Sequence, residues 1–209
     1  MQQEEQKKER VIAYIDGFNL YFGMRDASFD HCRWLNVNKL IQSLLHSHQE
    51  LIAVKYFTSR VSNSPDKQKR QSTYIDAIES TGVKVFYGNY KDNKEECKRC
   101  GNVWRSPKEK MTDVNIATSI IVDAFNDTYD MAMLVSGDSD LTPPINAVHN
   151  LFNKKRVFIA FPPKRHNSSM SLVAKGSLTI GRKKLLDAQF DEVVLSKTGY
   201  KLTKPLEWK

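Results

Sequence analysis

The chain has 209 residues, of which 40% are hydrophobic and 27% are charged. This length fits one domain with a single core, and the composition is that of a globular protein rather than a disordered or fibrous one. No stretch approaches the ~20 consecutive apolar residues of a membrane-spanning helix, and the first ten residues lack the apolar segment of a secretory signal. We therefore expect a cytoplasmic protein without a membrane partner.

The net charge of +8 favours a polyanionic partner, because Lys and Arg clusters neutralise phosphates and release condensed counterions. Charge alone leaves open a basic surface that only keeps the protein in solution. Three cysteines in a chain without a secretory signal argue against a disulfide framework.

Strand-like and helix-like segments alternate along the chain, which predicts an α/β fold with a mostly parallel sheet covered by helices on both faces. In chain order, the pattern predicts a strand at 11–15, a helix at 37–46, a strand at 51–58, a helix at 65–81, a strand at 83–87, a helix at 108–126, a strand at 131–135, a helix at 141–152, a strand at 156–161, a short helix at 169–175 and a short edge strand at 193–195.

The same pattern divides the chain into a body and less regular parts. Residues 1–10 are expected to form a flexible lead, residues 11–195 the single domain, and residues 196–209 a mobile polar tail. Within the domain, residues 91–107 form a polar, cysteine-containing insertion that is expected to be a loop.

Acidic residues stand where two apolar strands end. Asp16 follows the first strand, and Asp138 and Asp140 follow the strand at 131–135. Carboxyl ends of parallel strands share one edge of a sheet, and Asp113, early in the helix at 108–126, can reach the same crevice. Turn or helix capping would explain each acid singly, but not their joint placement.

Grouped carboxylates repel each other unless a cation lies between them. Mg²⁺ and Mn²⁺ prefer oxygen ligands of this kind. We therefore interpret these acids as a divalent-metal site, with these four expected ligands: Asp16, Asp113, Asp138 and Asp140.

Three segments carry a family resemblance: Tyr14–Tyr21, Glu109–Ala117 and Leu134–Leu141. In these motifs and their order, the chain resembles the NYN domain family, the LabA-like branch of the PIN-like ribonucleases. The resemblance extends from about Val11 to Val194, although many relatives have Gly-Val where this chain has Met111-Thr112.

The resemblance implies a PIN-like three-layer α/β/α sandwich and metal-dependent endoribonuclease activity. It carries catalytic and metal-binding roles onto Asp16, Asp113, Asp138 and Asp140. It also carries the positioning of substrate or of the attacking water onto Asn19 and Ser136.

A ribonuclease needs a basic rim around its acidic centre, because Lys and Arg hold the RNA backbone. Tyr21 could stack on an unpaired base, whereas Phe18 and Phe22 are expected to pack in the core. The candidate RNA contacts are Tyr21, Lys108, Lys110, Ser136, Lys164 and Arg165.

Cys97 and Cys100 have the spacing of one half of a zinc site, but the other half is not evident. A structural Zn²⁺ and a free thiol pair are the two interpretations that remain open.

The leading hypothesis is an endoribonuclease that uses Mg²⁺ or Mn²⁺ to hydrolyse RNA phosphodiester bonds. The alternatives are an RNA-binding or regulatory module without turnover and a small-molecule phosphohydrolase with Asp16 as nucleophile. The latter class usually has a second acid two residues on, where this chain has Phe18. Whether the protein forms a homo-oligomer is left open.

Overall fold

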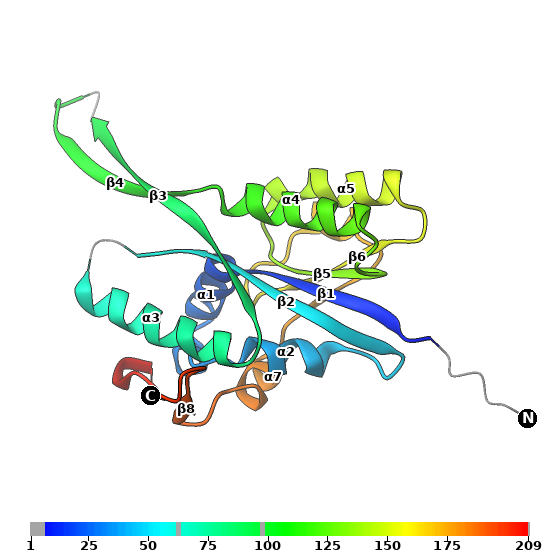
Figure 1. Ribbon diagram of the computed structural model, residues 1–209. Coiled ribbons are helices and arrows are strands. Elements are labelled where there is room, and N and C mark those ends of the chain that lie inside the picture. Colours follow the sequence, from blue (N-terminus) through cyan, green and yellow to red (C-terminus); the bar gives the residue numbers. More distant parts are fainter. Residues whose placement is uncertain (1–6, 62–63, 97–98, 209) are drawn as a thin grey trace, which may run out of the picture.

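A seven-stranded sheet in the order β4-β3-β2-β1-β5-β6-β7 forms the centre of the computed structural model (Figure 1). The structure describes residues 7–61, 64–96 and 99–208, with backbone only at 90–96 and 104–110. Six strands, from β3 to β7 across the sheet, are mutually parallel, and β4 is antiparallel to β3. The strands are β1 (Glu9–Asp16), β2 (Gln49–Ser59), β3 (Lys84–Glu96), β4 (Val103–Lys110), β5 (Met131–Val135), β6 (Arg156–Phe161) and β7 (Ser177–Thr179).

Helices cover both faces of this sheet and bury a separate hydrophobic core against each (Figure 1). One face carries α1 (Gly17–Asp26), α2 (Val37–Leu44), α3 (Pro65–Ser80) and α7 (Arg182–Asp187). The other carries α4 (Thr112–Phe125), α5 (Thr142–Leu151) and α6 (Ser168–Val173). Two short 3-10 turns are η1 (Asp30–Cys32) and η2 (Ser139–Leu141). The prediction of a three-layer α/β/α sandwich with a mostly parallel sheet is confirmed.

Strand β1 lies in the middle of the sheet, between β2 and β5. Its residues from Val11 to Ile15 are at most 4% exposed, which explains their unbroken apolar sequence, because a parallel strand covered on both faces has no solvent side. Ile15 lies opposite Val135, the last residue of β5. The carboxyl ends of β1 and β5 are therefore level, and the residues that follow them meet.

The insertion at 91–107 is not the expected loop. Strands β3 and β4 pair there as an antiparallel hairpin, from Asn89 opposite Lys110 to Glu96 opposite Val103, and the hairpin projects from the body (Figure 1). The ribbon extends beyond the helical layers, and its sequence lacks the apolar alternation that would have predicted strands. As a result α4 begins at Thr112, and Lys108 and Lys110 lie on β4 rather than on the predicted helix.

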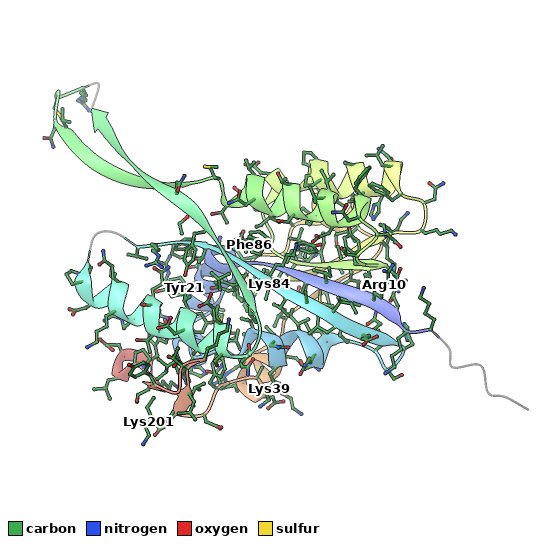
Figure 2. All side chains as sticks on the ribbon, viewed as in Figure 1. Arg10, Tyr21, Lys39, Lys84, Phe86 and Lys201 are labelled. Atoms are coloured by element: carbon green, nitrogen blue, oxygen red, sulfur yellow. The ribbon has the colours of Figure 1, made fainter. Side chains whose placement is uncertain are left out.

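Both ends of the described chain also depart from expectation. Strand β1 starts within the predicted lead, and Arg10 donates hydrogen bonds to Asp130 (2.8 Å) at the edge opposite the carboxyl ends of the strands (Figure 2). Residues 1–6 lie outside the described part. In place of a mobile tail, the C-terminal segment folds back onto α3 through β9 (Lys201–Thr203) and η3 (Leu206–Trp208).

Strand β8 (Val193–Leu195) pairs with β9 in a small separate sheet, so the prediction that it closes the main sheet was wrong; β7 does so. Trp208 is only 8% exposed and packs against Trp34, whose ring centroid is 6.3 Å away. One aromatic side chain thus anchors a segment whose other residues are mostly polar. Among the helices that the structure describes, none is long and apolar enough to cross a membrane.

Candidate active site

Asp16 is held rigidly at the end of β1. Its side chain caps α1, with Oδ1 accepting from the backbone N–H of Asn19 (3.0 Å), and its Oδ2 accepts from the hydroxyl of Ser136 (3.0 Å). The residue is 5% exposed. Asp16 is the last residue of the strand and the N-cap of the helix, so the chain passes from β1 to α1 without an intervening loop.

The turn after β5 is tied to this carboxylate. Ser136 is fully buried, and its hydroxyl also accepts from the backbone N–H of Asp138 (3.1 Å). The Asn19 side-chain oxygen accepts from the backbone N–H of Gly137 (3.0 Å). Ser136 and Asn19 therefore join the ends of β1 and β5. Because the Ser136 hydroxyl is buried, its assignment as an RNA contact is corrected to positioning of Asp16 and Asp138.

Asp113 approaches from the other helical layer, in the first turn of α4 as predicted. The start of α4 is attached to the end of β2 by a contact of 3.5 Å between the Thr112 and Ser59 hydroxyl oxygens. Met111, just before the helix, adopts a left-handed conformation (φ 78°), which glycine adopts without steric cost.

Asp113 lies within the electrostatic influence of two other acids of the expected site. The pKa of the Asp113 carboxyl is raised above its usual value, first by burial and then by the negative charges of Asp138 and Asp140. Asp138 caps η2 by accepting from the backbone N–H of Asp140 (3.0 Å), and Asp140 is exposed. We call Asp16, Asp113, Asp138 and Asp140 the carboxylate site.

The side chains of the carboxylate site are not drawn together into a complete metal shell. Across residues 7–61, 64–96 and 99–208, no three His, Cys, Asp or Glu side chains are grouped as ligands of one ion. The four expected ligands are therefore not assembled around one ion in this conformation. Mg²⁺ is commonly held by one or two carboxylates, with water and substrate phosphate oxygens as its other ligands.

The loop after β6 forms one wall of the site. A Cβ built on Gly137 would lie 1.9 Å from the carbonyl oxygen of Arg165, so only glycine allows this approach. Arg165 forms an ion pair with Asp26 at the end of α1, and Lys164 is exposed. Both stay candidates for RNA contact. Lys108 and Lys110 lie on β4, and their side chains are outside the described part.

Sequence reasoning missed Asn167, whose side-chain amide donates to the carbonyl of Gly137 (3.3 Å) and whose oxygen accepts from the N–H of Met170, capping α6. An Asn directly before a helical segment was the available signal. It also missed α1 as a helix, since the aromatic residues there obscured the period.

Next to the carboxylate site lies a cavity of about 430 Å³ between α1, α3 and η3, which we call the α1–α3 pocket. Phe18, Tyr21 and Phe22 line it and are half-buried, so the expectation that Phe18 and Phe22 belong to the core was wrong. Tyr21 lies between α1 and α3 (Figure 2).

Of the two predicted zinc ligands, one lies within the described part of the chain. Cys100 is an exposed free cysteine near the tip of the hairpin, and Cys97 lies outside the described residues. Cys32 is fully buried in the core below α1 and α2, so it is not available to complete a site at the hairpin. Zinc binding by Cys97 and Cys100 stays a prediction.

The parallel sheet and its two helical layers define a three-layer α/β/α protein, and acids end or follow two of its strands at the carboxyl edge. The model of the NYN domain matches residues 10–180, so the chain belongs to the NYN domain family, which is nuclease-like.

Individual relatives are distant. The chain is similar to 6-hydroxy-3-succinoylpyridine 3-monooxygenase HspA of Pseudomonas putida (strain DSM 28022 / S16), with 23% identity over 197 residues that cover 77% of this chain. It spans 62% of that protein's length. It is also similar in fold to the crystal structure of a protein of unknown function, VPA0982, from Vibrio parahaemolyticus RIMD 2210633. The TM-score is 0.58 and the identity 22%, covering 87% of this chain and 98% of the other.

Proposed function

We propose that this protein is an endoribonuclease that hydrolyses RNA phosphodiester bonds with Mg²⁺ or Mn²⁺ held at the carboxylate site. The observation that carries the proposal is the setting of Asp113, whose half-buried carboxyl lies near enough to Asp138 and Asp140 for their negative charges to raise its pKa. Among the described residues, none of these three acids has a salt-bridge partner. Uncompensated negative charge at a strand edge favours a bound cation.

The expected ligand atoms suit such an ion, because all of them are carboxylate oxygens at the carboxyl edge of the sheet. When bound, the cation supplies neutralisation of the phosphate and activation of the attacking water. The protein's own groups position the carboxylates: the Ser136 hydroxyl and the backbone N–H of Asn19 donate to Asp16, and the backbone N–H of Asp138 donates to Ser136. Hydrolysis by water in line with the scissile bond would leave a 3′-hydroxyl and a 5′-phosphate.

Asp138→Asn tests the proposal, because the substitution removes charge and keeps shape. Asn caps a turn as well as Asp does, so the bond to the N–H of Asp140 and the fold should persist. We expect the cleavage rate of a labelled RNA in Mg²⁺ or Mn²⁺ to fall at least about 100-fold, which corresponds to about 3 kcal/mol. EDTA should abolish cleavage by the wild type.

Asp187→Asn is the matched control, since Asp187 is an exposed acid at the end of α7, outside the carboxylate site. It should cleave like the wild type. A folded Asp138→Asn protein that cleaves at the wild-type rate would refute the assignment. Wild-type protein that binds RNA but does not cleave it with either metal would instead support the regulatory module.

A second candidate function is binding of a small heteroaromatic molecule, favoured by the aromatic α1–α3 pocket beside Asp16. The curated relative is named for a reaction of a substituted hydroxypyridine. Calorimetric titration with 6-hydroxy-3-succinoylpyridine tests this candidate, and absence of heat at millimolar ligand would exclude that compound. A phosphohydrolase with Asp16 as nucleophile is less favoured, because Phe18, where a second acid is needed, lines the pocket.

A further inference from the structure

The α1–α3 pocket begins at the residue that follows the proposed catalytic carboxylate. Gly17 lines the pocket, and the first turn of α1 lies between the pocket and the carboxylate site. Asn19 turns toward Gly137 and the carboxylate site. Phe18, Tyr21, Phe22 and Arg25 follow at helical spacing and line the pocket. One helical turn thus connects the two sites directly.

Six aromatic residues contribute to the wall of the pocket. Phe18 and Phe22 are stacked with 5.9 Å between ring centroids, and Tyr21 meets Phe22 edge to face at 5.3 Å. Tyr74 and Trp208 close the far side, 5.8 Å apart. A volume of about 430 Å³ lies within the range of small-molecule pockets. These walls suit a planar ring, which would gain stacking contacts on several sides.

Basic side chains also contribute to the lining of the pocket. Arg25 lies over the Phe22 ring (4.6 Å) and Arg33 over the Tyr21 ring (5.1 Å). Lys67 is exposed and has no ion-pair partner within the described part of the chain. The pocket lining contains four basic side chains and one acid, Glu207, which pairs with Arg70. Arg25 and Arg33 pair with Asp26 and Asp30, two acids outside the lining. A partly aromatic wall with basic side chains, of which Lys67 is available to pair with an anion, is complementary to a ring joined to a phosphate.

We propose that the α1–α3 pocket takes an unpaired nucleobase of the RNA strand, adjacent to the phosphate at the carboxylate site. This inference rests on the proposed function. A base inside a duplex has both faces stacked and cannot enter a recessed cavity, whereas an unpaired base can be inserted between aromatic rings. The pocket therefore makes the enzyme specific for single-stranded RNA, loops or bulges.

Binding in EDTA tests this inference without cleavage. The probe is a fluorescent single-stranded RNA of about twelve nucleotides, within the site sizes of single-strand binders. Further probes are its duplex, copies with one abasic residue at each position in turn, and free mononucleotides. The variants are Tyr21→Ala, Phe18→Ala and the conservative Tyr21→Phe. Phe125→Ala is the matched control, because Phe125 is a 78% exposed aromatic residue at the end of α4.

We expect Tyr21→Ala and Phe18→Ala to weaken binding of the single strand about tenfold, the lower part of the range for loss of one stacked base. Tyr21→Phe and Phe125→Ala should bind like the wild type, and all variants should bind the duplex alike. An abasic residue at one position of the RNA should weaken wild-type binding by the same factor as the alanine substitutions. The same abasic RNA should not weaken binding by Tyr21→Ala any further. Thermal unfolding of each variant shows that the fold is intact.

Unchanged binding by both alanine variants would overturn the inference, as would an abasic effect that is equal at every position. Binding of mononucleotides or hydroxypyridines but not of RNA would overturn it in favour of a small ligand. The nuclease proposal can be refuted independently of the pocket assignment. RNA binding with the expected variant effects but no cleavage in Mg²⁺ or Mn²⁺ leaves the pocket assignment standing. If the protein cleaves RNA and the pocket variants bind RNA like the wild type, the nuclease proposal stands and the pocket assignment is refuted.

Discussion

Replacement of Gly137 by Ala should damage both stability and the site. The new Cβ would lie 1.9 Å from the Arg165 carbonyl oxygen and 2.9 Å from the carbonyl carbon. Because these are backbone atoms, no side-chain rotation relieves the overlap, and either the loop after β6 or the turn after β5 must move. Overpacking costs about 1–3 kcal/mol, and we expect the upper value here. For a chain of this size, about 3 kcal/mol lowers Tm by about 6–12 °C.

The assay is thermal unfolding followed by circular dichroism, with Gly181→Ala as the matched control. A Cβ on Gly181 would meet no atom within 4 Å, so that change should cost under about 1 kcal/mol, from helix capping alone. Movement of the turn after β5 would also misplace Asp138, and a displacement of about 1 Å can reduce catalysis about 100-fold. Equal Tm values for the two variants would refute the close approach of Gly137 and Arg165.

Three further perturbations test other parts of the structure. Hydrogen bonds from Arg10 hold the pKa of Asp130 at about 2, so the unfolded chain protonates first as pH falls from about 4. The stability that Asp130 contributes should be complete near pH 6 and lost near pH 2, where urea unfolding of wild type and Asp130→Asn should converge; a constant difference would contradict the linkage. Trp208→Ala should destabilise the fold by about 3 kcal/mol in urea unfolding, and an unchanged urea midpoint would argue against the buried C-terminal anchor. Lys164→Ala should reduce the log-log salt slope of RNA binding by about one for every sequence tested, and an unaltered slope would place the RNA elsewhere.

The body of the fold was predictable because its strands are buried on both faces. Residues 131–135 and 156–161 have the predicted strand bounds, since an unbroken apolar run between polar turns admits few alternatives. The hairpin and the C-terminal segment were not predictable in the same way. The hairpin sequence has no regular apolar alternation, and the C-terminal segment is anchored mainly by Trp208, whose partner Trp34 is far away in sequence.

The carboxylate site was predictable in part. The turn motifs indicated Asp16, Asp138 and Asp140, because acids at strand ends stand out against apolar runs. The network beneath them was not, since it depends on which hydroxyl or amide faces which strand end. The Ser136 hydroxyl, the bond from Gly137 to Asn19 and the contribution of Asn167 require the register of β1 against β5. Sequence patterns do not determine that register.

The pairing of β1 with β5 also governs when the protein can become active. Asp16 and Ser136 are separated by 120 positions, and the strands that bring them together pair in parallel across that interval. Such long-range parallel pairing forms late and slowly, because the entropy of closing the loop must be overcome before the contacts form. A chain emerging from the ribosome would thus carry Asp16 without its partners until β5 has been synthesised and inserted. The carboxylate site would therefore be assembled only with the completed sheet.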